Sequence, residues 1–482
     1  MTQLSLSRRN FLAASAAGLA IRPWSRVLGA NSDIRVAVIG VRNIGKTHLM
    51  NFPKIPGVRV VAVCDVDSDV LGQRADEFEK QFGAIRKYTD LREVMDAPDV
   101  DAVVLAVPNH WHALGTIWAC QAGKDVYVEK PCSYNIWEAG QMIQAAEKYQ
   151  RIVQVGIQRR SLAHMQDWFR EVQAGALGKI RSVHGMYYAR RQPIGRVDAP
   201  IAPPPQVNHD LWSGPAPTPI WRKNYHYDWH WFWDVGNGEL GNNGPHILDL
   251  ARTALGVKEL PTKVWSLGGR YGWEDDNGQT PNTHIIHYGY EPAPIIMEIR
   301  NLPARAGTKE NNLFHGINLG IVIEGEEGRY VGFDTGKVFD RDGKLVREIT
   351  GKRGADGGRQ PHRENFIKAM RSRNSSDLNC NLQDGHLSSS LCHLGNISHL
   401  LGKEVSLPEA EEQIKSAYGF GEAGERLKEH LQLNDLPTNE LAIQLGAPLK
   451  YDPKQVTFPE SPAATALLKR EYRAPFIVPE TV

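Results

Sequence analysis

A regular alternation of apolar, strand-like runs with helix-like stretches between residues 34 and 155 constrains the fold of this chain more than any other feature. The strand-like runs are residues 34–39, 58–64, 102–106, 126–128 and 152–155. Strands that alternate with helices form βαβ units around a parallel sheet. We therefore expect an α/β fold that begins with a Rossmann-type dinucleotide-binding domain over about residues 32–155.

A glycine turn joins the first run to a helix-like stretch. The dinucleotide fingerprint G-x-G-x-x-G would place glycines at positions 40, 42 and 45, and this chain has Gly40, Arg42 and Gly45. The middle glycine normally lets the backbone approach a pyrophosphate, so Arg42 weakens the match. The guanidinium could itself contact a phosphate.

An acidic residue follows the second run. Asp65 lies about 20 residues beyond the glycine turn, where a carboxylate accepts hydrogen bonds from the adenosine ribose and repels a 2′-phosphate. This position predicts NAD rather than NADP as the cofactor. Asp67 is a second candidate for the same role, and a turn carboxylate without a ligand is the structural alternative.

The tripeptide Glu129-Lys130-Pro131 stands where the fourth run ends. Ligands of open parallel sheets bind beyond the carboxyl ends of the strands. A lysine in that place, fixed by a following proline, is a candidate acid/base group. The structural alternative is a surface lysine in a turn.

The pattern changes after Gly156. Strand-like runs dominate from residue 262 to 339, which predicts an α+β second domain, residues 156–402, with a large open antiparallel sheet. An uncovered apolar sheet face needs a partner, so we expect a homodimer or homotetramer. Eight prolines within residues 193–219 predict an arm without regular structure. Residues 403–482 show no core pattern of their own, and we interpret them as an extension packed on the second domain.

The composition excludes several classes of protein. Of 482 residues, 41% are hydrophobic and 23% are charged, as in soluble globular proteins. Lys and Arg number 56 and Asp and Glu number 55, a net charge of +1 that gives no reason to expect nucleic acid or an anionic membrane as partner. The five cysteines are scattered without a C-x-x-C pair, so we predict no metal site and no disulfide framework.

The amino-terminal residues have the features of a twin-arginine export signal. Ser7-Arg8-Arg9-Asn10-Phe11-Leu12 precedes a small-residue apolar run over residues 12–21, and Ala30 is a candidate cleavage point. The run is too short to span a bilayer. We expect export to the periplasm or another extracytoplasmic compartment. Leu28 departs from the small residue preferred before cleavage, so an uncleaved tether stays open, as does a basic N-terminus without function.

With these features in place, the chain resembles the Gfo/Idh/MocA family, which includes glucose–fructose oxidoreductase and inositol dehydrogenase. The resemblance runs from about residue 34 to 401, and its most specific motif is VEKP. The matching segments are AVIGVRNIG at 37–45, PNHWH at 108–112, VEKP at 128–131 and GNNGPHILDLAR at 241–252. The family pairs a Rossmann domain with an open antiparallel sheet. The leader and the added tail resemble exported members.

The resemblance implies roles for individual residues. Lys130 is implied to lie near the nicotinamide C4 and the reacting hydroxyl, with His246 as a second catalytic residue. The family has an Asp where this chain has Asn242, and an amide cannot stabilise an imidazolium by charge. Implied cofactor contacts are Gly40, Arg42, Asn43, Ile44, Gly45, Asp65, Pro108, Asn109, His112, Glu129 and Lys130. Implied substrate contacts are Gln158, Arg160, Trp231, His246 and His362.

An aromatic run, YHYDWHWFW at residues 225–233, has aromatic side chains at every odd position. If extended, it would present one aromatic face, including Trp231, and one polar face. Such a face stacks on sugar rings. Aromatic packing in a core or a dimer interface is an equal alternative.

These observations predict an NAD-dependent oxidoreductase acting on a carbohydrate substrate. A protein exported folded can carry a cofactor bound inside the cell, and that cofactor must then be regenerated in each turnover. Hydride exchange between two sugars would do this, and so would redox-assisted glycoside cleavage, as in the NAD-dependent N-acetylgalactosaminidases. Two alternatives stay open: a non-catalytic sugar- or partner-binding protein, and a cytoplasmic dehydrogenase without a true leader.

Overall fold

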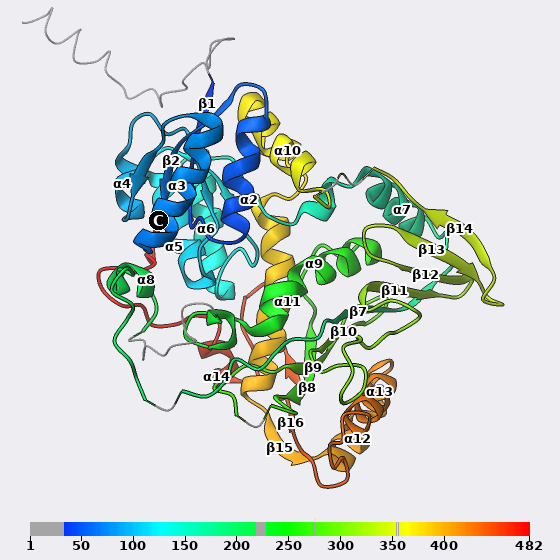
Figure 1. The fold of residues 1–482 in the computed structure, drawn as a ribbon. Helices are drawn as coiled ribbons and strands as arrows, with labels where there is room; N and C mark the ends of the chain where they lie inside the picture. The colour runs from blue at the N-terminus through cyan, green and yellow to red at the C-terminus, as the bar shows by residue number, and fades with distance from the viewer. Residues whose placement is uncertain (1–32, 198, 218–227, 274, 353, 355) are drawn as a thin grey trace, which may run out of the picture. The chain divides into compact units, whose positions relative to one another are not determined.

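Each strand-like run predicted between residues 34 and 155 forms a strand of one parallel sheet with the order β3-β2-β1-β4-β5-β6. Figure 1 labels β1 and β2 of this sheet. The strands are β1 (Ile34–Ile39), β2 (Val58–Cys64), β3 (Arg86–Tyr88), β4 (Ala102–Leu105), β5 (Asp125–Val128) and β6 (Val153–Val155). The edge strand β3 was not predicted, because its three residues are charged or only half-buried. The central strands are buried on both faces, which is why they show as continuous apolar runs.

The structure is a computed structural model that describes residues 33–482, except for 198, 218–227, 274, 353 and 355. The predicted export signal and the start of the aromatic run lie outside the described residues. Residues 34–482 form one compact unit. Within the described part of the chain, no helix has the length and apolar character that a membrane span requires.

Helices connect the strands of the parallel sheet. They are α2 (Ile44–Asn51), α3 (Ser68–Phe82), α4 (Leu91–Asp96), α5 (His112–Gln121) and α6 (Ile136–Lys148). Local sequence fixes where three of them begin. The side chains of Asp67, Asp90 and Asn135 accept hydrogen bonds from backbone N–H groups in the first turns of α3, α4 and α6, as N-cap residues do.

The second sheet has eleven strands, and its main path runs β14-β13-β12-β11-β7-β10-β9-β8-β16-β15. Its strands are β7 (Ile180–Tyr188), β8 (Lys263–Gly269), β9 (Thr283–Gly289), β10 (Ile295–Arg300), β11 (Leu319–Gly325), β12 (Gly328–Gly332), β13 (Gly336–Asp340), β14 (Leu345–Ile349), β15 (Lys403–Ser406), β16 (Ala442–Leu445) and β17 (Leu449–Lys450). The sheet is antiparallel as predicted, except that β7 and β10 pair in parallel. The chain between them is long enough for the crossover that a parallel pair requires.

Helices cover both faces of this sheet. Helices α7 (Ala163–Gln173), α9 (Gly238–Leu255) and α11 (Leu382–Leu400) contribute to the larger core on one face. On the other face, α12 (Leu407–Ile414) and α13 (Phe420–Gln432) pack on Leu267, Ile285 and Ile296. The chain's own extension therefore covers part of the face that we expected a partner to cover. The homodimer or homotetramer stays a prediction.

The proline-rich arm contains regular structure, contrary to the prediction from its prolines. Between its prolines it forms the short helix α8 (His209–Ser213), which Asn208 caps. Just before α8, the arm pairs with the parallel sheet's periphery: Ser68 N donates to the Gln206 carbonyl at 2.9 Å, and Asn208 N donates to the Val66 carbonyl at 2.9 Å. The prediction failed because five consecutive residues without proline suffice for one helical turn.

The extension also departs from its predicted place. Strands β15 to β17 join the second sheet, but Phe476, Val478 and Val482 belong to the core of the first domain. Phe476 packs edge-on against Trp111, with 5.4 Å between the ring centroids. A short helix, α14 (Pro462–Ala466), precedes this stretch. The extension therefore packs on both domains rather than on the second alone. The sequence pattern does not predict this, because the apolar residues of the extension are few and widely spaced.

Candidate functional site

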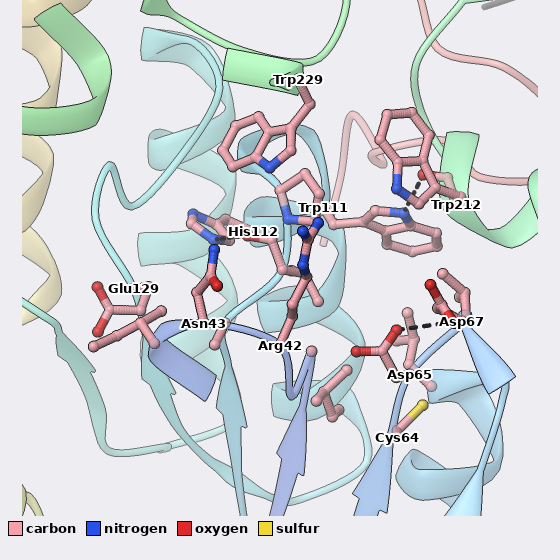
Figure 2. Close-up of a pocket in the computed structure, with 18 of the residues that line it drawn as sticks. Arg42, Asn43, Cys64, Asp65, Asp67, Trp111, His112, Glu129, Trp212 and Trp229 are labelled. Atoms are coloured by element: carbon pink, nitrogen blue, oxygen red, sulfur yellow. Dashed lines mark hydrogen bonds between the residues drawn. The ribbon is translucent and has the colours of Figure 1, made fainter. Parts of the chain in front are cut away.

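A cavity of about 340 Å³ lies at the carboxyl ends of β1, β2, β4 and β5 (Figure 2). This volume is in the range of small-molecule sites. The cavity brings together most of the residues that the sequence implied for cofactor contact. Its lining includes Gly40, Arg42, Asn43, Ile44, Asp65, Pro108, Asn109, His112, Glu129, Lys130 and Asn242. Gly45 does not line the cavity, but it packs against Gly40, which does.

The glycine turn leaves no room for side chains at two positions. Gly40 has φ +79°, and a Cβ there would lie 2.6 Å from the Ala106 carbonyl oxygen. A Cβ on Gly45 would lie 1.7 Å from the Gly40 carbonyl oxygen. The turn from β1 into α2 is therefore tight enough to require glycine at both positions. Such a turn exposes the first N–H groups of a helix to a phosphate.

The two aspartates after β2 have different partners. Asp67 is 3% exposed and caps α3 through one oxygen. Asp65 accepts 2.9 and 3.0 Å hydrogen bonds from the backbone N–H groups of Val41 and Asp67. Burial raises the pKa of Asp65, while these two bonds and the charge of Arg42 oppose that rise. Asp65 keeps free lone pairs at the cavity, so it is the better candidate for a ribose.

The arm and the aromatic run also contribute to the cavity lining, through Leu211, Trp212 and Trp229. In Figure 2, Trp212 stands on the Asp65 side of the cavity. The Trp111 indole N–H donates to the carbonyls of Leu211 and Trp212 at 3.0 and 3.2 Å. No periodic pattern predicts the place of Leu211 and Trp212, because tertiary contacts with residues about a hundred positions earlier in the chain hold them there.

The extension holds the arm in place. The Arg473 guanidinium contacts the Asp210 carboxylate at 2.6 Å and its carbonyl at 2.8 Å, and it also donates to the Gly214 carbonyl at 3.0 Å. A Cβ on Gly214 would lie 2.2 Å from the Trp111 ring, so the arm lies directly against that indole.

Glu129 anchors the turn that carries the candidate lysine. Its carboxylate is 2.9 Å from the His48 Nε2, and a Cβ on Gly156 would lie within 2.8 Å of it. Burial alone would raise the pKa of Glu129, but the His48 hydrogen bond and the charges of His48 and Lys130 lower it to about 2. Glu129 is therefore an ionised, buried partner for the neighbouring Lys130.

Lys130 reaches across to α9. Its Nζ donates to the Asn242 carbonyl at 2.7 Å. Burial lowers the pKa of Lys130, while the negative charges of Glu129 and Glu239 oppose that shift. A lysine whose ammonium is destabilised by burial is easier to deprotonate, as an acid/base group must be.

His246 lies one turn beyond Asn242 on α9 and does not line the cavity itself. Burial, together with the positive charges of Arg159, Lys130 and Arg359, lowers its pKa, so the ring is neutral at pH 7. Its buried Nδ1 has no hydrogen-bond partner among the described residues. A buried ring nitrogen without a partner is the kind of group that a ligand satisfies.

Two residues implied as substrate contacts are engaged elsewhere. The Arg160 guanidinium contacts Asp249 at 2.9 Å, Asp384 at 2.9 Å and the Thr253 hydroxyl at 3.2 Å. Both ring nitrogens of His362 are bonded, one to the Val155 carbonyl at 2.9 Å and one to the Ser161 hydroxyl at 2.7 Å. Neither residue lines the cavity, and these contacts hold both side chains within the protein; their contact with a substrate stays a prediction.

The aromatic run is not extended where the structure describes it. Residues Trp229–Trp231 form a 3₁₀ helix, which turns successive rings to different sides. Trp231 is 2% exposed and packs against Arg270 and Trp273. This agrees with the alternative interpretation, in which the aromatic run packs in a core. Trp229, not Trp231, lines the cavity. Gln158 is buried at the start of another 3₁₀ helix and does not line the cavity either.

The cavity fits a dinucleotide. The glycine turn provides a cradle that a Cβ would fill, and Asp65 stands at the adjoining strand end. Lys130 lies at the opposite end, beyond β5. Among the described residues, no group of three or more His, Cys, Asp or Glu side chains has the geometry to hold a metal ion. All five cysteines are free and buried.

Comparisons with known proteins agree with this geometry. Residues 34–157 match the family described as "Oxidoreductase family, NAD-binding Rossmann fold". The chain is 31% identical over 148 residues to the scyllo-inositol 2-dehydrogenase (NAD(+)) of Bacillus subtilis, covering 30% of this chain and 42% of that protein. It is 26% identical over 229 residues to the levoglucosan dehydrogenase of Pseudarthrobacter phenanthrenivorans, covering 46% of this chain and 52% of that protein.

The curated relatives are thus matched over only about half of their length, between 42 and 52%. Among solved structures, a levoglucosan dehydrogenase in complex with NADH and levoglucosan superimposes with a TM-score of 0.56 at 20% identity. The superposition covers 76% of this chain and 96% of the other. At that identity the likeness establishes the two-domain fold.

Proposed function

Because residues 34–157 belong to the Gfo/Idh/MocA oxidoreductases, a family with an NAD-binding Rossmann fold, we propose that this chain is an NAD-dependent oxidoreductase. Its substrate would be a sugar, a sugar derivative or a glycoside, the class to which inositol and levoglucosan belong. The observation that carries the proposal is the position of Lys130. Its Nζ lies 2.7 Å from the Asn242 carbonyl and borders the dinucleotide cavity.

The chemistry required is the oxidation of a secondary alcohol. NAD, when bound, supplies the acceptor for the hydride. Lys130 takes the proton of the reacting hydroxyl, and its burial favours the neutral amine that this needs. Asp65 binds the adenosine ribose, and its charge excludes a 2′-phosphate, so NAD is preferred over NADP.

The arm supports a second part of the proposal: the cofactor is held tightly and recycled in each turnover. Leu211 and Trp212 line the cavity, with Trp212 on its Asp65 side (Figure 2). Arg473 ties that segment to the extension through Asp210 and Gly214. We infer that an arm held in this way slows the release of a dinucleotide bound against it.

Replacing Trp212 with Ala should therefore release the cofactor. Loss of an aromatic ring stacked on a base costs about 1–3 kcal/mol, so we expect NAD to dissociate about 5- to 150-fold faster. The measurement is NAD remaining after gel filtration, followed over time. Trp273→Ala is the matched control, since Trp273 packs on Arg270 and Trp231 and does not line the cavity. Equal retention by both variants would contradict the role of the arm.

His246 supports redox-assisted glycoside cleavage as the net reaction. After oxidation, the new carbonyl acidifies the neighbouring C–H bond. His246, neutral at pH 7, takes that proton, and the C–O bond to the aglycone breaks with its electron pair on the leaving oxygen. Water then adds to the resulting double bond, and return of the hydride to the carbonyl carbon completes the cycle.

One assay tests these proposals together. Purified protein without added NAD is given nitrophenyl glycosides and pairs of free sugars. Aglycone release, or conversion of one sugar at the expense of the other, is the expected result. Turnover only with added NAD would mean an ordinary dehydrogenase. Sugar binding without any turnover would mean a non-catalytic binding protein.

We also propose export by the twin-arginine route, on the strength of residues 7–21. Changing Arg8 and Arg9 together to Lys should move the protein from the periplasmic to the cytoplasmic fraction, because the pathway reads the arginine pair. Cell fractionation with immunodetection measures this. Arg22→Lys, outside the motif, should leave localisation unchanged. Periplasmic protein in the double variant would argue against this route.

A further inference from the structure

A buried carboxylate at the start of α9 has no role in the mechanism described so far. Glu239 is fully buried, with 0% exposure. It accepts hydrogen bonds from the Arg191 guanidinium at 2.9 and 3.2 Å, from the Asn242 amide at 3.2 Å and from the Asn243 amide. The His230 Nε2 lies 3.7 Å away. These donors offset the cost of burying the carboxylate, which is high for an unpaired charge.

Glu239 carries that charge at neutral pH. Burial alone would raise the pKa of its carboxyl group, but the contacts with His230 and Arg191 lower it to about 2. An ionised carboxylate can only accept hydrogen bonds. The Asn242 side chain must therefore turn its NH₂ group toward Glu239, and its oxygen is left for another donor.

That oxygen belongs to a residue that borders the cavity, beside Lys130. We propose that Glu239 is a positioning residue, which fixes the Asn242 side-chain oxygen as the acceptor for a substrate hydroxyl next to Lys130. The negative charge that the resemblance implies at position 242 would then be supplied by Glu239, about one helical turn earlier on α9. This inference rests on the proposed function, because it concerns the substrate of that same site.

The proposal predicts the sign of one substitution. If Asn242 were only a weakened form of the acidic residue implied by the resemblance, Asn242→Asp would raise activity. With Glu239 ionised 3.2 Å away, a second carboxylate is repelled instead. We expect Asn242→Asp to lower kcat/KM about 100-fold, and Glu239→Gln to lower it about 10- to 100-fold, mainly through KM, because the hydroxyl acceptor is no longer fixed.

The double variant Glu239→Gln/Asn242→Asp is the decisive experiment. It restores one carboxylate and one amide donor, so it should recover at least about 10-fold of the activity lost in Asn242→Asp. No recovery, or additive losses, would overturn the inference. Glu171→Gln is the matched control, since that side chain is 43% exposed and pairs only with Arg347 at the surface; its kcat/KM should equal that of the parent.

A substrate-free measurement separates this inference from the proposed function. The thermal midpoint of the same four proteins should show the same coupling, with Asn242→Asp destabilising the parent more than the Glu239→Gln background. Coupling without turnover on any sugar would leave Glu239 in place and reject the proposed function. Turnover without coupling would reject the role of Glu239.

Discussion

Replacing Lys130 with Met should lower kcat by a factor on the order of 10²–10⁴, the usual contribution of a positioned acid/base group. Met matches the length of the lysine stem but cannot take a proton. The Nζ contact with the Asn242 carbonyl is lost, while the glycine turn and Asp65 are untouched. NAD should therefore stay bound.

The measurement is pre-steady-state absorbance of the reduced nicotinamide, together with the NAD content of the purified variant. Lys80→Met is the matched control, because Lys80 is exposed on α3 and should leave the rate unchanged. A Lys130→Met enzyme with parental turnover would remove the lysine from the mechanism. A variant that loses NAD as well would point to a structural role.

Replacing Gly45 with Ala should abolish retention of the cofactor and destabilise the protein. The new Cβ would lie 1.7 Å from the Gly40 carbonyl oxygen, a backbone atom that cannot move aside without opening the turn between β1 and α2. Overpacking of this kind costs about 1–3 kcal/mol. Opening the turn also moves the N–H groups of α2 away from the position a phosphate would occupy.

Gly72→Ala provides the comparison within the same domain. Gly72 lies inside α3, and a Cβ there would meet nothing within 4 Å. Since glycine is a poor helix former, this change should stabilise the protein by about 0.5–1 kcal/mol. Thermal unfolding and NAD content measure both variants. Retention of NAD by Gly45→Ala would mean that the turn does not hold the dinucleotide.

Much of the fold could be predicted because strands buried on both faces of a parallel sheet appear in the sequence as continuous apolar runs. The bounds of β1 and β2 agree with the apolar runs to the residue. The same logic predicted that Asp65 and Lys130 lie at one cavity, since residues that follow parallel strands share one edge of the sheet. Edge strand β3 was missed because an exposed strand has no apolar pattern.

The rest depends on contacts that no local pattern encodes. Arg160 and His362 were predicted as substrate contacts from the resemblance alone, and no local pattern indicates their contacts with Asp249 and the Val155 carbonyl. Trp212 reaches the cavity only because the arm pairs with the chain after β2. The buried Glu239 carboxylate is ionised partly because it pairs with Arg191, which lies 48 residues earlier in the chain.

The contacts of Phe476, Val478 and Val482 determine when the core of the first domain can be completed during protein synthesis. These side chains complete the core of a domain whose strands come from residues 34–155. A ribosome therefore releases the Rossmann strands long before the residues that seal them against Trp111 exist. The first domain reaches its final packing only after these residues have been synthesised, and a fragment ending near residue 400 would lack the Phe476 contact with Trp111 and would be more prone to aggregation.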